Sequence, residues 1–169
     1  LDESTTTALE VIAGGKLYQV VVDSAETGKS LLERGQLQKR VTIVPLDKVD
    51  GRKAHDSQIK AAEKVSKNEA KLAVSLVTAK DQSVQSVMNY VFGRAFVCQT
   101  QETAKRVAFD KNVLLNCVTV EGDLLNPTGL LTGGSRNKGS SVLKKLKAFS
   151  EAEMKVSELR DDIERCDRD

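Results

Sequence analysis

The sequence contains no tryptophan, two prolines and a single histidine, and aromatic residues make up only 4% of its 169 residues. Because His55 has no second histidine to act with it, neither a zinc site nor a histidine-based catalytic triad is expected. The three cysteines, Cys98, Cys117 and Cys166, form no Cys-x-x-Cys pair and are odd in number, which favours free thiols in a reducing compartment. No apolar run approaches the roughly 20 residues of a membrane span, and the first residues show no signal-peptide pattern.

The composition is typical of a folded domain. Hydrophobic residues make up 40% of the chain and charged residues 30%, and the length corresponds to about one domain. The 26 Lys and Arg residues against 24 Asp and Glu give a net charge of only +2, so the overall charge indicates no partner. The first residue is leucine rather than methionine, and we therefore expect a piece of a longer protein.

Helical and extended patterns alternate along the first 120 residues. Amphipathic spacing and capping residues predict helices over 6–13, 24–34, 59–65, 82–92 and 101–109. Apolar and β-branched runs predict strands over 17–22, 41–46, 72–77, 95–98 and 113–120. The run 17–22 is almost continuously apolar, which predicts a strand buried on both faces.

The two halves of this pattern resemble each other. Glu26-Thr27-Gly28-Lys29 recurs 76 residues later as Glu102-Thr103-Ala104-Lys105, and each half has the order helix, glycine, strand, helix, strand. The sequence therefore predicts an α/β (α+β) fold of two related subdomains, residues 1–81 and 82–141, each with a small mixed sheet flanked by helices.

A heptad pattern begins at residue 142. Its a and d positions are apolar except for Lys145, and they hold Val142, Phe149, Ala152, Val156, Leu159, Ile163 and Cys166. This pattern predicts that residues 142–169 begin a coiled-coil arm. A lone amphipathic surface helix is the alternative.

Gly28-Lys29-Ser30 follows a predicted strand and imitates part of a phosphate-binding loop. Such a loop needs a glycine five residues before Gly28, where Asp23 stands, and Asp23 and Glu26 would place carboxylates beside the phosphates. A small nucleotide-binding α/β enzyme with a degenerate loop is therefore kept only as an alternative function. Carboxylate pairs such as Asp161-Asp162 lie on the predicted coil and are expected to be solvated.

Two segments near the end are candidate binding sites. No acidic residue occurs from 124 to 150, and the basic residues there are Arg136, Lys138, Lys144, Lys145 and Lys147. They predict contacts to nucleic-acid phosphates, with an ordinary solvated helix start as the alternative. The second segment is apolar and flanked by glycine, and it comprises Gly129, Leu130, Leu131, Thr132, Gly133 and Gly134. It predicts a sheet edge that pairs with a partner strand, with a simple β-turn as the alternative.

Residues 6–141 resemble the hinge domain of the structural maintenance of chromosomes (SMC) family. The most specific pieces are residues 8–18, 20–23, 27–29, 31–35, 91–93, 96–98, 104–110, 122–123 and 127–134. The last of these reads Pro127-x-Gly129-x-Leu131-Thr132-Gly133-Gly134, with Asn126 where the family usually has Asp and Thr132 where Ser is common. Within the family, these sequence segments are most similar to the type-2 condensin subunits.

The resemblance implies a non-catalytic dimerisation module in the middle of a very long chain, with antiparallel coiled-coil arms. ATP and Mg²⁺ would bind at head domains outside this segment, and the segment itself would hold no cofactor or metal. The implied partner is a second SMC hinge, from the other condensin SMC subunit, with a homodimer possible in isolation. Weak, non-specific DNA binding, a role in chromosome condensation and segregation, and a location in the nucleus, on chromosomes and in the cytoplasm for part of the cell cycle are also implied, with no membrane contact.

Overall fold

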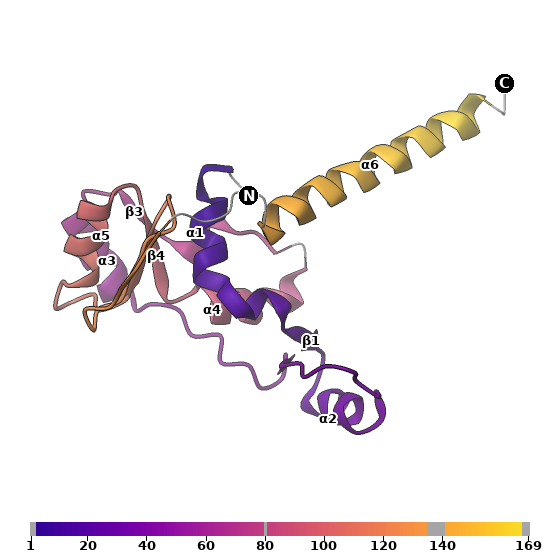
Figure 1. Cartoon of the computed structure of the whole chain (residues 1–169), viewed down its shortest axis with the longest axis horizontal. Helices are drawn as coiled ribbons and strands as arrows, with labels where there is room; N and C mark the ends of the chain where they lie inside the picture. The colour runs from indigo at the N-terminus through magenta and orange to yellow at the C-terminus, as the bar shows by residue number, and fades with distance from the viewer. Residues whose placement is uncertain (1–2, 80, 135–140, 167–169) are drawn as a thin grey trace. The chain divides into compact units, whose positions relative to one another are not determined.

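The computed structural model describes residues 3–79, 81–134 and 141–166 (Figure 1). The chain divides into two compact units, residues 1–135 and 136–169, and each is described separately below. The first unit contains two sheets with their helices, and the second contains one long helix.

The larger sheet lies at the centre of the first unit. Among the described residues it has five strands, in the order β3 (Ala70–Leu72), β4 (Ala95–Cys98), β5 (Asn116–Thr119), β6 (Leu124–Leu125) and β7 (Leu131–Thr132). Only β4 and β5 are parallel, and the other pairs are antiparallel, so the sheet is mixed. All four residues of β4 are buried, as expected for a central strand covered on both faces.

Helices cover both faces of this sheet (Figure 1). They are α1 (Glu3–Ala13), α3 (Asp56–Ser66), α4 (Gln85–Phe92) and α5 (Gln101–Ala108). Helices α3 and α5 lie on one face and contact each other, whereas α1 and α4 lie on the other. The core between α3, α5 and the sheet includes Phe96, Val107 and Leu125, and short 3-10 turns at Gly14–Tyr18, Ala73–Leu76 and Gln82–Val84 join the elements.

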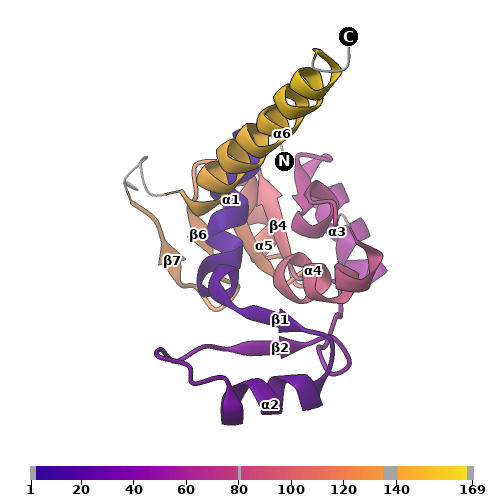
Figure 2. The same cartoon turned by 90° about the vertical axis from the view of Figure 1, so that its right-hand side faces the viewer.

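The smaller sheet consists, in the described chain, of the parallel strands β1 (Val20–Val22) and β2 (Ile43–Pro45), joined through α2 (Ala25–Arg34). Figure 2 shows α2 packed along this pair of strands. The prediction that the strand at 17–22 is buried on both faces is wrong, because Val20 and Val21 are 38% and 40% exposed. A parallel pair needs a layer on each face to be buried, and α2 provides only one.

The expected repeat is visible in the structure. Both β1-α2-β2 and β4-α5-β5 are parallel strand pairs joined by a helix. The helix caps are also equivalent, since the Thr27 amide donates to the Ser24 hydroxyl and the Thr103 amide donates to the Thr100 hydroxyl, each at 3.2 Å. Strand β3 lies in the expected first subdomain but pairs with β4 in the larger sheet, and the boundary at residue 81 stays a prediction.

Two predicted strands are shorter than expected. The run 72–77 contributes only Leu72 to β3, and the chain then turns into a 3-10 helix. The run 113–120 forms a strand only from Asn116, because Leu114 adopts a left-handed backbone with φ 48°. The amides of Val113 and Leu114 both donate to the Asp110 carbonyl, so this stretch completes the turn after α5.

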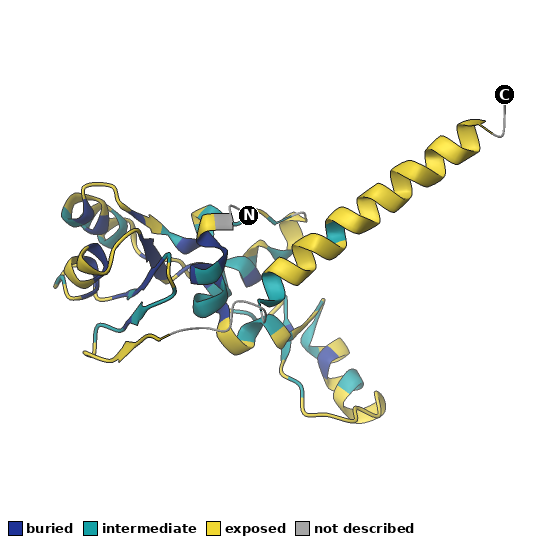
Figure 3. Ribbon diagram, turned by 45° about the horizontal axis from the view of Figure 1, so that its top comes forward, coloured by how far each residue is buried: buried dark blue, intermediate teal, exposed yellow. Residues whose placement is uncertain are grey.

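The second unit is helix α6 (Val142–Cys166), which agrees with the expected start of a coiled-coil arm. No described residue of α6 is buried, as Figure 3 shows along its length. Phe149, Val156, Leu159 and Ile163 of the heptad stripe are exposed. Within the described residues, no helix has both the length and the apolar character needed to span a membrane.

We predict that the Thr100 cap stabilises the larger sheet through α5. The side chains of Thr103, Ala104, Val107 and Ala108 of α5 are buried. Destabilising the first turn of α5 therefore also weakens packing in the core. Thr100→Ala should lower the free energy of unfolding by about 1 kcal/mol, measured by denaturant unfolding. Thr100→Ser keeps the hydroxyl and is the control, so an equal loss in both variants would contradict a capping role.

Candidate functional site

Strand β7 forms an edge of the larger sheet in the described part of the chain (Figure 2). It pairs with β6 alone, with Leu131 opposite Leu125 and Thr132 opposite Leu124. The side chains of Leu130 and Leu131 are 69% and 59% exposed. An exposed, apolar strand edge is a template on which another strand can pair.

The backbone hydrogen bonds show which groups of β7 face outward. The Asn126 amide donates to the Leu130 carbonyl at 2.9 Å, so the polar groups of Leu130 point toward β6. Successive residues of a strand present their amide and carbonyl groups to opposite sides in the plane of the sheet. The amide and carbonyl of Leu131 therefore face the open edge, where a partner strand would meet them.

A turn leads into strand β7, so the glycine-flanked segment contains both a turn and an edge strand, and its pairing with a partner strand stays a prediction. The Asn126 side-chain oxygen accepts from the Thr128 amide and hydroxyl, at 2.9 and 2.7 Å. An aspartate would offer the same acceptor oxygen, so the asparagine preserves the turn. Gly129 and Gly134 have φ of 94° and 137°, which side-chain-bearing residues rarely adopt. A Cβ at Gly133 would clash with the Asp123 carboxylate.

The smaller sheet presents a second apolar surface that the sequence did not reveal. Val20 and Val21 of β1 are exposed, and the elements around the sheet add Tyr18 in the preceding turn, Leu32 on α2 and Leu37 after α2. The same apolar run had indicated a buried strand, and no sequence pattern distinguishes burial within a chain from burial against a partner. Each strand of this sheet also has an unpaired edge within the described residues.

The Gly28-Lys29-Ser30 motif lies inside α2 and forms no phosphate-binding loop. Gly28 is buried, and a Cβ there would lie 3.2 Å from Ile43 Cγ2. Lys29 is 3.8 Å from Glu33 one turn later in the same helix. The Thr27 hydroxyl and the Ser24 backbone hold the pKa of Asp23 below its usual value, so a charged carboxylate stands before the helix. The degenerate-loop alternative is not supported.

The structure describes only part of the predicted basic site. Lys144, Lys145 and Lys147 are exposed on α6, whereas Arg136 and Lys138 lie outside the described residues. Successive helix residues are about 100° apart, which places Lys145 on the same face as Phe149, in the apolar stripe. Lys144 and Lys147 are neighbours on the face of the helix away from the stripe, and Lys147 lies 3.9 Å from Glu151.

The remaining chemically reactive side chains have structural surroundings. Cys98 and Cys117 are buried, and a hydrogen bond between them together with burial raises the pKa of the Cys117 thiol. The backbone amide of His55 donates to the Gln58 side chain at the start of α3. Among the described residues, no group of three or more His, Cys, Asp or Glu side chains could hold a metal ion.

An open apolar strand edge on a small mixed-sheet unit is typical of a protein-interaction domain. Residues 1–108 match the family described as the SMC proteins flexible hinge domain. The chain belongs to this SMC hinge family, whose domains join chains and are not catalytic.

Proteins from several organisms are similar over most of the chain. Structural maintenance of chromosomes protein 2-1 of Arabidopsis thaliana is 50% identical over 156 residues, which are 92% of this chain and 13% of that protein. Structural maintenance of chromosomes protein 2 of Homo sapiens is 43% identical over 153 residues, 90% of this chain and 13% of that protein. The chain thus spans about 13% of the length of these relatives.

Solved hinge structures have the same fold. An asymmetric dimer of the Geobacillus stearothermophilus SMC hinge domain matches with a TM-score of 0.71 and 25% identity, over 98% of this chain and 67% of that one. The Pyrococcus furiosus SMC hinge domain matches with a TM-score of 0.59 and 28% identity, over 83% of this chain and 70% of that one. The expected fold class is therefore confirmed.

We predict that the three thiols differ sharply in reactivity. Cys166 is exposed, whereas the thiols of Cys98 and Cys117 are enclosed in the core. An aromatic disulfide reagent at about pH 8 should therefore titrate one thiol per folded chain and all three after unfolding in guanidinium. Rapid reaction of a second thiol in the folded chain would contradict the packing of β4 against β5.

Proposed function

We propose that this hinge joins its chain to a partner SMC hinge through the edge of β7. The outward-facing backbone of Leu131, beside the exposed side chains of Leu130 and Leu131, carries the proposal. The proposed interface residues are Gly129, Leu130, Leu131, Thr132, Gly133 and Gly134. The Geobacillus hinge, which shares the fold, is described as a dimer, and this supports the same use here.

The smaller sheet is the proposed receiving surface on the partner. It combines free strand edges with exposed apolar residues, and β7 of the partner would cover Val20 and Val21 or the edge of β2. If each hinge both donates β7 and receives it, the pair is closed by two equivalent contacts. This arrangement would explain why each of the two sheets of a hinge has, in its described residues, an unpaired edge beside exposed apolar residues.

We infer that the complete protein is a subunit of a condensin-like complex. Identities of 36–50% to proteins named structural maintenance of chromosomes protein 2 support a partner from the other condensin SMC subunit, with homodimers in its absence. We place the protein on chromosomes and in the nucleus, with a cytoplasmic phase of the cell cycle, in chromosome condensation and segregation. ATP and Mg²⁺ would act at head domains in the remainder of the protein.

Weak, sequence-independent DNA binding is a second part of the proposal. Its contacts are the exposed Lys144 and Lys147, together with Arg136, Lys138 and Lys145 of the same basic stretch. Lys145 should contribute least, because it lies among apolar residues that pair when the arm forms a coil. Few aromatic side chains are present for base stacking, so phosphate contacts would supply the affinity.

The edge of β7 is tested by Leu131→Pro. Proline removes the outward amide but leaves the Leu130 carbonyl bonded to Asn126, so β6 and β7 stay paired. Light scattering of the hinge mixed with its partner hinge should show association weakened about two- to tenfold, the value of one net hydrogen bond. Leu131→Thr retains the amide and is the control.

Unchanged association of the proline variant, with a native circular dichroism spectrum, would place the interface elsewhere. A charge at Gly133 is a poorer test. Its side chain would meet the Asp123 carboxylate of the same hinge, so the variant would change a contact within the hinge as well as any contact with the partner.

DNA binding is tested by reversing charge on α6. The pair Lys144→Glu and Lys147→Glu should weaken binding of a labelled oligonucleotide in fluorescence anisotropy and reduce its salt dependence, by a slope of about 0.7 to 0.9 per lost phosphate contact. The control pair Lys60→Glu and Lys64→Glu makes the same charge change on exposed positions of α3. Equal weakening by both pairs would show a general charge effect rather than a site.

A further inference from the structure

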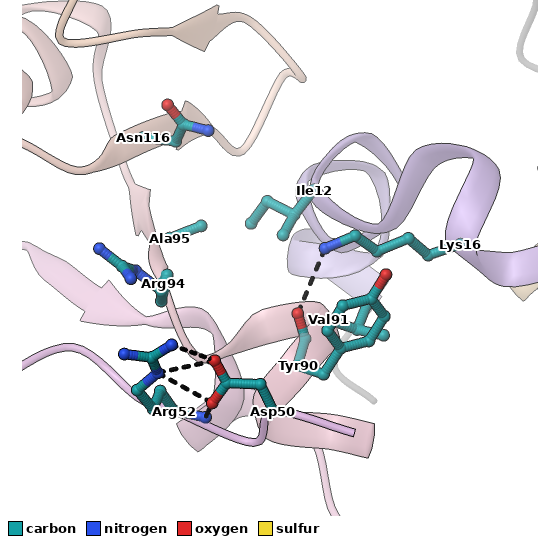
Figure 4. Close-up of a pocket in the computed structure, with 9 residues that line it drawn as sticks. All are labelled: Ile12, Lys16, Asp50, Arg52, Tyr90, Val91, Arg94, Ala95 and Asn116. Atoms are coloured by element: carbon teal, nitrogen blue, oxygen red, sulfur yellow. Dashed lines mark hydrogen bonds and ion pairs between the residues drawn. The ribbon is translucent and has the colours of Figure 1, made fainter. Parts of the chain in front are cut away.

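A pocket of about 350 Å³ lies in the first unit, away from β7 (Figure 4). It forms where the N-terminal ends of β4 and β5 meet α1, α4 and the segment before Ala54. Its lining residues are Ile12, Lys16, Asp50, Arg52, Tyr90, Val91, Arg94, Ala95 and Asn116. Three of these side chains are cationic and one is anionic, although they come from segments that are far apart in the sequence.

The single carboxylate of the pocket is already paired. Arg52 Nη2 lies 2.5 Å from Asp50 Oδ2, and Arg52 Nε donates to both carboxylate oxygens at 2.9 and 2.7 Å. These hydrogen bonds hold the pKa of Asp50 below its usual value, so the carboxylate stays charged and bound to Arg52 near neutral pH. Lys16 and Arg94 form no ion pair among the described residues, although Asp50 and Arg94 attract each other electrostatically.

Lys16 and Arg94 line the pocket from different elements and lie on opposite sides of it in Figure 4. The Lys16 ammonium donates to the Tyr90 carbonyl at 3.2 Å and lies 4.4 Å from the centre of the Tyr90 ring, which fixes its position. Asn116, at the start of β5, adds an amide from above in this view. Ile12, Val91 and Ala95 provide an apolar wall beside these polar groups.

We propose that this pocket binds the phosphate of a phosphorylated serine or threonine side chain on a partner protein. A phosphate monoester carries about −1.5 to −2 charges near pH 7, which matches the net positive charge that three cations and one carboxylate give the pocket. The pocket lining offers the phosphate oxygens a guanidinium fork, an ammonium and an amide as donors, and it offers the carbon stem an apolar wall. A carboxylate offers one charge and two oxygens and leaves one cation unmatched.

A nucleic-acid strand fits the same pocket less well. The Tyr90 ring face is covered by the Lys16 ammonium, so a base cannot stack on that face. Asp50 lies at the same site and would repel the phosphates that precede and follow a bound one. The pocket is therefore suited to a single isolated phosphate.

The proposal is tested by amide NMR titration of the hinge with a capped five-residue phosphoserine peptide. The resonances of Arg94, Ala95 and Asn116 should shift, and the affinity should fall between about pH 7.5 and pH 5.5, since the second phosphate pKa is near 6. The same peptide with glutamate in place of phosphoserine should bind at least about tenfold more weakly. Equal binding of the two peptides, or shifts caused only by an oligothymidylate probe, would overturn the proposal.

Variants separate this pocket from general charge effects. Arg94→Gln should weaken peptide binding about tenfold and Arg94→Lys by less, because lysine keeps the charge but loses the fork. Lys53→Gln removes an exposed charge that does not line the pocket and should leave binding unchanged. Asp50→Asn should strengthen binding severalfold, since it removes the competing carboxylate. Weakening by Asp50→Asn in a chain with a native spectrum, or equal weakening by Lys53→Gln, would overturn the assignment.

Discussion

The parallel pairing of β4 with β5 is the interaction on which the rest of the first unit depends. A parallel pair requires a crossover connection, which α5 provides. It also requires a layer on each face: α3 and α5 cover one face, and α1 and α4 cover the other. Its N-terminal ends create the cationic pocket, where Ala95 and Asn116 begin the two strands. From β5, the antiparallel turns through β6 carry the chain to the open edge at β7.

The two halves of the repeat differ in how fully their strand pairs are completed. The pair β4–β5 gains β3 on one side and β6 with β7 on the other, and Phe96 is 1% exposed. The pair β1–β2 gains no further strand in the described residues, and its valines stay partly exposed. The same β-α-β unit thus produces a core in one copy and an apolar surface in the other. A second chain is the simplest source of the missing layer.

Local features were predictable from the sequence because local interactions determine them. Ser24 was a recognisable cap at the start of α2, Gly35 marked the end of that helix, and the tetrads 76 residues apart indicated a repeat. Burial was not predictable in the same way. Val20 and Val21 have the pattern of a central strand, but burial depends on which elements cover a strand, and that is a property of the assembled sheet.

The pocket shows a different limit of sequence analysis. Lys16, Arg52 and Arg94 are separated by roughly 40 residues each, and none belongs to a spaced motif. Gly93 offered the one local signal, since a side chain there would meet the Arg52 carbonyl at 3.0 Å and the Asn89 carbonyl. The Ala54 amide also donates to the Gly93 carbonyl at 2.7 Å, so this close approach of two backbones holds the Arg52 segment against β4.

Helix α6 combines two demands within one short segment. The heptad stripe requires a partner helix with an apolar face. The lysines at the start of α6 favour an anionic ligand such as a phosphate. These demands are compatible only if they use different faces, because a lysine within a coiled-coil seam must extend its ammonium past the apolar contact to water. Lys144 and Lys147 satisfy this condition, whereas Lys145 lies in the seam. In the proposed DNA contact, the basic charge available to phosphates is therefore smaller than the count of lysines in the sequence, and the register of the coil decides which of them contribute.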